Sequence, residues 1–133
     1  MNVQQRKEKA MEARRQGYNC AQALLVAFDD ILPLDRDTIL KVSAAFGTGM
    51  GLGEACGVVT GMAMAQGLLI DSADPKAKVQ AMLASKSVGT TFKNQNGNIR
   101  CADLKSKPNI KPCNDLICNG IEILSEYLEN QHY

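Results

Sequence analysis

Apolar residues recur at helical spacing along most of the chain. No segment alternates strictly between apolar and polar residues, as a half-buried strand would. The pattern predicts helices over residues 3–16, 20–31, 35–46, 54–69 and 75–92, and a last helix that includes residues 116–128. The chain is therefore expected to be all-α, a single-domain bundle of about five to six helices.

Residues that favour helix ends support several of these boundaries. Gly17 is placed to end the first helix, and Asn19 is a favourable N-cap for the second. Asp35 or Asp37 can cap the third helix, and Pro75 fits the first position of the fifth. These signals are local, so they locate helix ends without saying how the helices pack.

The segment between the fifth and last helices is expected to be irregular. The stretch NQNGN, residues 94–98, favours a break. Residues 99–112 contain two prolines and are expected to form a loop with about one helical turn.

Glycine is concentrated in the middle of the chain. The stretch GTGMGLG, residues 47–53, is expected to form a tight connection between helices, because it lacks the spacing of a dinucleotide fingerprint and no Walker lysine follows it. Gly53, Gly57 and Gly61, followed by Ala65, are four residues apart and would form a groove along one helix. We expect the helix that begins at Cys20 to pack into this groove.

Composition and charge limit the possible partners and location. The 133 residues are 45% hydrophobic and 22% charged, so we expect one globular domain over residues 1–133. The net charge of +1 favours neither nucleic acid nor an anionic membrane surface. The longest apolar stretch, residues 52–70, is interrupted by polar residues and is not expected to span a membrane. The first residues do not resemble a secretory signal, so we expect a cytoplasmic protein.

The candidate chemistry is that of the five cysteines. A disulfide framework is not expected in a cytoplasmic protein, which leaves redox chemistry, metal binding or passive burial. Cys20, Cys56 and Cys113 are expected at or near helix N-termini, where backbone N–H groups and the helix dipole favour a thiolate. Cys101 lies in the irregular segment, from which it can reach the others. Cys118 is about 140° around the last helix from Cys113 and is expected to be a passive helix residue.

Our leading hypothesis is a thiol-based redox protein, compatible with a thiol–disulfide oxidoreductase. Its catalytic residues would be Cys20, Cys56, Cys101 and Cys113, with Cys56 as the thiolate and Cys20 as its partner. Cys101 and Cys113 would form or resolve a second pair, although four cysteines allow three pairings. The partner would be a redox protein or a small thiol, and a homodimer is compatible with the sequence.

Two other functions remain open. The same four cysteines, Cys20, Cys56, Cys101 and Cys113, are candidate ligands of zinc or an iron–sulfur cluster. Successive cysteines of this set have 35, 44 and 11 residues between them, a spacing that matches neither a zinc ribbon nor a C-x-x-C oxidoreductase. The third possibility is a helical interaction module with structural cysteines. The single histidine, His132, is expected to be a solvated tail residue rather than the base of a cysteine nucleophile.

Four segments resemble the C_GCAxxG_C_C family of redox-active proteins, which is named for its cysteine pattern. They are GYNCAQALLVAF, FGTGMGLGEACGVVTGMAMAQGL, FKNQNGNIRCADL and CNDLICNGIEILSEYL, and together they cover nearly the full chain. The resemblance implies that the four family cysteines are Cys20, Cys56, Cys101 and Cys113, and that they act together.

The same resemblance makes Gly57 and Gly61 the motif glycines, which we assign as candidate cofactor-binding positions. The chain departs from the family pattern at two positions. Val58 occupies the position of the motif alanine and is expected to narrow the space around Cys56, and Cys118 is additional to the four family cysteines.

Overall fold

The computed structural model describes residues 1–71 and 73–131, and within these ranges it contains α-helices and no β-strand. The α-helices are α1 (Val3–Arg15), α2 (Cys20–Val26), α3 (Arg36–Ser43), α4 (Gly57–Ile70), α5 (Lys78–Asn96), α6 (Cys101–Leu104) and α7 (Cys113–Asn130). Two shorter segments, the helical turn η1 (Ala44–Phe46) and the glycine-rich turn η2 (Gly49–Gly53), connect α3 to the chain before α4. The all-α prediction is confirmed for the described residues, with one more helix than expected because α6 forms a separate turn.

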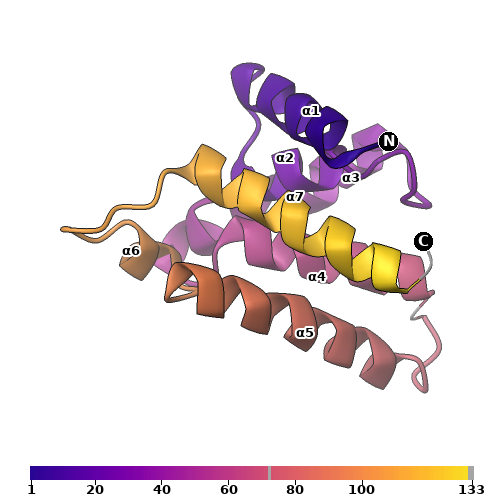
Figure 1. Cartoon of the computed structure of the whole chain (residues 1–133). Helices are drawn as coiled ribbons and strands as arrows, with labels where there is room; N and C mark the ends of the chain where they lie inside the picture. Colours follow the sequence, from indigo (N-terminus) through magenta and orange to yellow (C-terminus); the bar gives the residue numbers. More distant parts are fainter. Residues whose placement is uncertain (72, 132–133) are drawn as a thin grey trace.

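The helices form one bundle around α4 and α7. Figure 1 shows α4 and α7 running in the same direction, with α5 beside them in the opposite direction. On the other side, α2 packs against α4, and α1 packs against both α2 and α7. Leu24, Phe92 and Ile121 are fully buried where these helices meet. The same packing places α6 and the first residues of α4 and α7 at one end of the bundle, on the left of Figure 1.

The helix-capping predictions are confirmed where the signal is a local hydrogen bond. The Asn19 side chain accepts a hydrogen bond from the Gln22 N–H, and the Gln22 side chain accepts one from the Asn19 N–H, each at 2.9 Å. Asp35 caps α3 by accepting from the Thr38 N–H. Gly17 follows α1 with a φ of +98°, a conformation that glycine adopts readily.

Helix α2 is shorter than predicted, ending at Val26 instead of residue 31. The Arg6 side chain donates a hydrogen bond to the Ala27 carbonyl, and the Ile31 N–H bonds instead to the Phe28 carbonyl. The chain therefore tightens into turns after Val26. This contact comes from α1, so the sequence of α2 alone could not indicate it.

Helix α5 differs from the prediction at both ends. The Asp74 side chain accepts from the Lys76 N–H and holds a turn, so the helix begins at Lys78 instead of residue 75. At the other end the helix continues into the predicted break at residues 94–98, because the Asn96 side chain bonds to both the Phe92 carbonyl and the Asn119 side chain of α7.

Helix α4 begins at Gly57 instead of residue 54. Gly53 therefore lies outside the predicted groove, in η2, with a φ of +71°. Only Gly57, Gly61 and Ala65 share the helical ridge that the sequence predicted.

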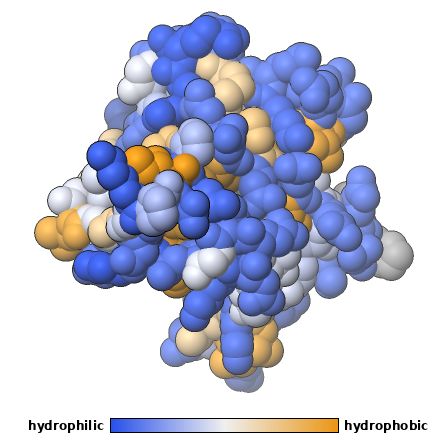
Figure 2. Space-filling view, turned by 60° about the vertical axis from the view of Figure 1, so that its left-hand side comes forward, coloured by the Kyte–Doolittle hydropathy of each residue, from blue (hydrophilic) through white to orange (hydrophobic). Residues whose placement is uncertain are grey.

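The face of the molecule drawn in Figure 2 is mostly hydrophilic. Figure 2 shows the left-hand side of Figure 1 turned toward the viewer, with apolar areas separated by hydrophilic residues. No helix in the described ranges is both long and apolar enough to cross a membrane. His132, expected to be a solvated tail residue, lies outside the described residues.

Candidate functional site

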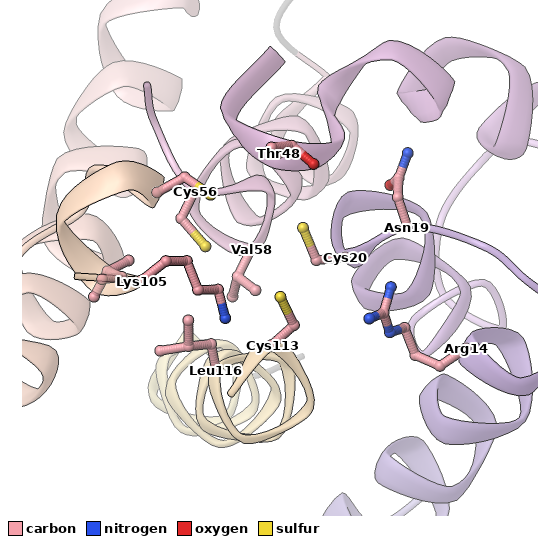
Figure 3. A pocket seen from close by; sticks show the side chains of 11 residues that line it. Arg14, Asn19, Cys20, Thr48, Cys56, Val58, Lys105, Cys113 and Leu116 are labelled. Carbon is pink, nitrogen blue, oxygen red and sulfur yellow. The ribbon is translucent and has the colours of Figure 1, made fainter. Parts of the chain in front are cut away.

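The four predicted cysteines all lie at helix starts and line one pocket. Cys20, Cys101 and Cys113 are the first residues of α2, α6 and α7, and Cys56 is the N-cap of α4. The pocket has a volume of about 200 Å³ (Figure 3). All five cysteines of the chain, including Cys118, are free thiols. The structure therefore brings together residues that are up to 93 positions apart in the sequence.

A short backbone pairing joins the segments that carry Cys56 and Cys101. The Cys56 N–H donates to the Ile99 carbonyl at 2.7 Å, and the Cys101 N–H donates to the Glu54 carbonyl at 2.6 Å. An ion pair between Arg100 and Glu54, at 3.2 Å, spans the same two segments. These two segments form a single bridge, between Ala55 and Arg100, which is too short to produce an alternating sequence pattern that could have predicted it.

The motif glycines allow α2 to approach α4 closely. A Cβ atom on Gly57 would lie 2.5 Å from the Cys20 sulfur and 3.0 Å from the Ala21 nitrogen. A Cβ atom on Gly61 would lie 2.8 Å from a methyl group of Leu24. The prediction that the helix beginning at Cys20 packs onto this glycine ridge is confirmed. At Gly57, the missing side chain leaves room for the Cys20 sulfur.

The glycine-rich segment provides one hydrogen bond to the site. Thr48, Gly49 and Met50 have φ values of 53°, 58° and 60°, which is a left-handed turn. A Cβ atom on Gly49 would lie 2.4 Å from the Glu54 nitrogen, so the turn requires glycine there. The Thr48 N–H hydrogen-bonds to the Cys20 sulfur. The predicted tight connection is confirmed, and it also positions this donor.

The surroundings of Cys20 favour its thiolate. A hydrogen bond from the Cys56 thiol is the largest influence, and it lowers the pKa of Cys20 to about 6 together with the Thr48 and Ala21 N–H groups and the Arg14 guanidinium. Burial acts in the opposite direction. The Cys20 side chain thus carries the negative charge of the pair near neutral pH.

The pKa of Cys56 shifts in the opposite direction, upward. Its hydrogen bond to the Cys20 sulfur and its burial raise the pKa of Cys56, although the Val58 and Val59 N–H groups act against this. The sulfurs of both cysteines therefore accept hydrogen bonds from backbone N–H groups. Cys20 is favoured as the thiolate because it is closer to Arg14 and more exposed, at 9% against 4% for Cys56. The sequence-based expectation placed the thiolate on Cys56 instead, and that assignment stays a prediction.

Cys101 and Cys113 also line the pocket, and they are partly buried and therefore more exposed than Cys20 and Cys56. Burial raises the pKa of Cys101, as do the charges of Cys20 and Cys113, and the Lys105 ammonium lowers it. Cys101 is therefore close enough to Cys20 and Cys113 for their charges to act on it. It is expected to be a protonated thiol when Cys20 is a thiolate.

Comparison with known proteins identifies the family of this chain. The model of the family described as "Putative redox-active protein (C_GCAxxG_C_C)" matches residues 18–127. The chain belongs to this family. No curated protein and no solved structure matches it. The C_GCAxxG_C_C family assignment establishes a redox role in general terms and leaves the reaction to be proposed.

This C_GCAxxG_C_C protein accommodates the valine at the motif alanine position by means of a glycine on α7. Val58 is fully buried and lines the pocket beside Cys56. A Cβ atom on Gly120 would lie 2.3 Å from a methyl group of Val58. The larger side chain at position 58 thus fills the space that a side chain at position 120 would otherwise occupy.

Cys118, the cysteine outside the family pattern, is not among the residues lining the pocket. It is partly buried, which raises its pKa, and the charges that act on it are those of Lys7, Asp115 and Glu122. The expectation that Cys118 and Cys113 do not share a helix face is confirmed. Its expected passive role stays a prediction.

The structure gives no separate support for a metal centre. Among the described residues, no group of three or more His, Cys, Asp or Glu side chains is arranged to hold a metal ion. The zinc and iron–sulfur alternatives, and the cofactor-binding assignment of Gly57 and Gly61, stay predictions. In this structure the two glycines contact α2.

Three residues at the site were missed by sequence reasoning. Thr48 donates its N–H to Cys20, while Arg14 and Lys105 bring positive charge to the pocket. Figure 3 shows the Arg14 guanidinium and the Lys105 ammonium on opposite sides of Cys113. Arg14 and Lys105 are two of many basic residues and Thr48 acts through its backbone, so no local pattern distinguishes them.

Proposed function

We propose that this protein performs thiol–disulfide exchange, with Cys20 as the nucleophile and Cys56 as the thiol that resolves the product. The observation that carries the proposal is the hydrogen-bonded pair of sulfurs in the pocket, in which Cys20 has a pKa of about 6. A thiol whose pKa lies below 7 is mostly thiolate at neutral pH, and the thiolate is the reactive form.

The exchange has two steps. The Cys20 thiolate attacks one sulfur of a disulfide substrate, forms a mixed disulfide and releases the other half as a thiolate. Cys56 then attacks the Cys20 sulfur, its proton passes to the departing thiolate, and a Cys20–Cys56 disulfide remains. Overall the protein dithiol is oxidised and the substrate disulfide is reduced to two thiols.

Two features of the pocket support this assignment of roles. Cys20 and Cys56 both line the pocket, and Cys56 is the more buried of the two, at 4% exposed against 9%, and already donates to the Cys20 sulfur. When Cys20 becomes part of a mixed disulfide, it no longer carries the negative charge that raises the pKa of Cys56. Cys56 is then easier to deprotonate, which suits a resolving thiol.

Cys101 and Cys113 are assigned to the second pair. Both are more exposed than Cys20 and Cys56, so a partner protein or a small thiol can reach them more easily. In this proposal they pass electrons from an external dithiol to the inner pair by the same exchange chemistry.

Trapping the mixed disulfide tests the order of attack. The Cys56→Ser variant should accumulate one substrate half on Cys20 when treated with 2-hydroxyethyl disulfide, because the resolving thiol is missing. The Cys20→Ser variant should form no adduct at Cys56 at comparable speed. Intact-mass measurement followed by peptide mapping locates the adduct, with Cys118→Ser as the matched control. An adduct on Cys56 in Cys20→Ser, with none on Cys20 in Cys56→Ser, would contradict the assignment.

A further inference from the structure

Two basic side chains at the pocket have no acidic partner. Arg14, in the last turn of α1, donates to the Asn114 side-chain oxygen and to the Tyr18 carbonyl, both at 3.0 Å. Lys105, which follows α6, donates to the Lys111 carbonyl. All of these acceptors are neutral. Neither Arg14 nor Lys105 forms an ion pair in the part of the chain that the structure describes, and no Asp or Glu is among the residues lining the pocket.

Two other basic residues of α1 have acidic partners elsewhere in the bundle. Arg6 pairs with Asp30 at 2.6 Å, and Lys9 pairs with Asp29. Arg14 and Lys105 are partly buried as well, but the positive charge they bring to the pocket is not neutralised by a carboxylate. A partly buried charge is screened less by water and salt than an exposed one, so its effect inside the pocket is stronger.

The thiolate of Cys20 offsets only one of the two positive charges. With Cys20 ionised, the two cations and one thiolate leave the pocket positive overall. When Cys20 is in a disulfide, the thiolate is gone and both positive charges are uncompensated. The pocket therefore favours a negatively charged molecule in both redox states, and favours it more strongly in the oxidised state.

The size and walls of the pocket limit the molecule further. A volume of about 200 Å³ is below the range of roughly 300–1,000 Å³ that is typical of sites for drug-sized ligands. Val58, Leu104 and Leu116 line it with apolar surface. A short carbon chain fits these walls, and a negatively charged end group can reach the basic side chains.

We propose that the substrate is a small anionic disulfide, and that Arg14 and Lys105 bind its negatively charged end groups while one of its sulfurs meets Cys20. The inference rests on the proposed exchange function and adds the substrate class. The Cys20 sulfur bonds to one sulfur of the substrate as the substrate S–S bond breaks. The first half leaves as a thiolate, and the second half stays bound to Cys20 as a mixed disulfide. When Cys56 attacks the Cys20 sulfur, this second half leaves as a thiolate and takes the Cys56 proton, and the protein disulfide forms.

The direct test compares three small symmetrical disulfides of similar length that differ in charge. They are dithiodiglycolate, a dianion; 2-hydroxyethyl disulfide, which is neutral; and cystamine, a dication. The rate of protein disulfide formation is measured for each at constant pH, then divided by the rate of the same disulfide with free 2-mercaptoethanol. We expect the normalised rate to be greatest for the dianion and about tenfold or more above that of the dication.

Variants separate substrate binding from an indirect effect on Cys20. Arg14→Gln and Lys105→Gln should each reduce the ratio of dianion to dication rates, and the double variant should bring it close to one. A change in the pKa of Cys20 alone would alter all three rates together and leave the ratio unchanged. Lys86→Gln, at an exposed lysine of α5, is the matched control and should retain the wild-type ratio.

The outcomes distinguish this inference from the function on which it rests. Equal normalised rates for the three disulfides, with a Cys20–Cys56 disulfide formed in each case, would overturn the substrate class and leave the exchange function in place. A preference for the dianion that persists in the double variant would also overturn the assignment to Arg14 and Lys105. Failure of all three disulfides to oxidise the protein would overturn the exchange function itself.

Discussion

At the scale of single residues, Cys20 and Cys56 show how position decides the chemistry of a thiol. Both sulfurs lie at a helix start and accept hydrogen bonds from backbone N–H groups. Such hydrogen bonds lower the pKa of a thiol. The sulfurs also share one hydrogen bond, so only one of them can be the thiolate at a time. The Arg14 guanidinium and the greater exposure of Cys20 decide in favour of Cys20.

The first prediction concerns the titration of Cys20. In a variant with Cys101, Cys113 and Cys118 replaced by Ser, the thiolate of Cys20 should form with a midpoint near pH 6. Its alkylation by iodoacetamide should therefore rise as the pH increases through 6 and change little above pH 8. Ultraviolet absorbance of the thiolate measures the same midpoint independently of access to the pocket.

Replacing Cys56 by Ala in that background removes the thiol that donates to Cys20, which is the largest influence on its pKa. The midpoint should then move upward, toward the usual value near 8.5. A midpoint that stays near 6 would show that the Cys56 hydrogen bond does not stabilise the thiolate.

At the scale of helices, the site depends on how closely α2 and α4 approach each other. Gly57 and Gly61 are both in α4, where glycine lowers helix stability by about 0.5–1 kcal/mol relative to alanine. At Gly57 the space for a side chain is taken by the Cys20 sulfur and by backbone atoms of Ala21 and Phe46. The glycine is retained because the packing requires it, despite its cost to the helix.

This packing is tested by two glycine-to-alanine substitutions that are expected to change the free energy of unfolding in opposite directions. Gly57→Ala should lower the free energy of unfolding by about 1–3 kcal/mol, since the backbone atoms around it cannot easily move. Gly89→Ala is the matched control within α5, where the nearest atom to a new Cβ is 3.9 Å away. It should raise the free energy of unfolding by about 0.5–1 kcal/mol through helix propensity.

Urea unfolding of both variants and of the wild type gives the free energies of unfolding. The slope of free energy against urea concentration should be the same for all three proteins, which shows that their unfolding transitions can be compared. The packing account would be wrong if Gly57→Ala were as stable as Gly89→Ala and kept the wild-type reactivity of Cys20.

Helix boundaries show which features the sequence could predict. The caps at Asn19 and Asp35 depend on residues three positions away, so the sequence contains both partners of each hydrogen bond. The end of α2 depends on Arg6, and the extension of α5 depends on Asn119, both of which are distant in sequence. Local patterns therefore predicted the existence of the helices better than their ends.

At the scale of the whole molecule, the sequence predicted the all-α fold and the set of four cysteines, but not the environment that distinguishes them. Helical periodicity and the cysteine pattern are properties of the chain itself. The charge at the pocket arises because α1 and the segment after α6 place Arg14 and Lys105 beside thiols that are distant in sequence. That proximity exists only after the helices pack, and it is the basis for proposing Cys20, instead of Cys56, as the thiolate.

The most direct test of the account is to identify the disulfide that forms first when the reduced protein is mildly oxidised. We predict the loss of two hydrogen atoms in the intact mass, a linkage between Cys20 and Cys56 by peptide mapping, and full reversal by a dithiol reductant. Cys118→Ser should behave like the wild type. An oxidised protein in which Cys20 and Cys56 remain free thiols, with the linkage between other cysteines, would contradict the central claim that these two residues form the reactive pair.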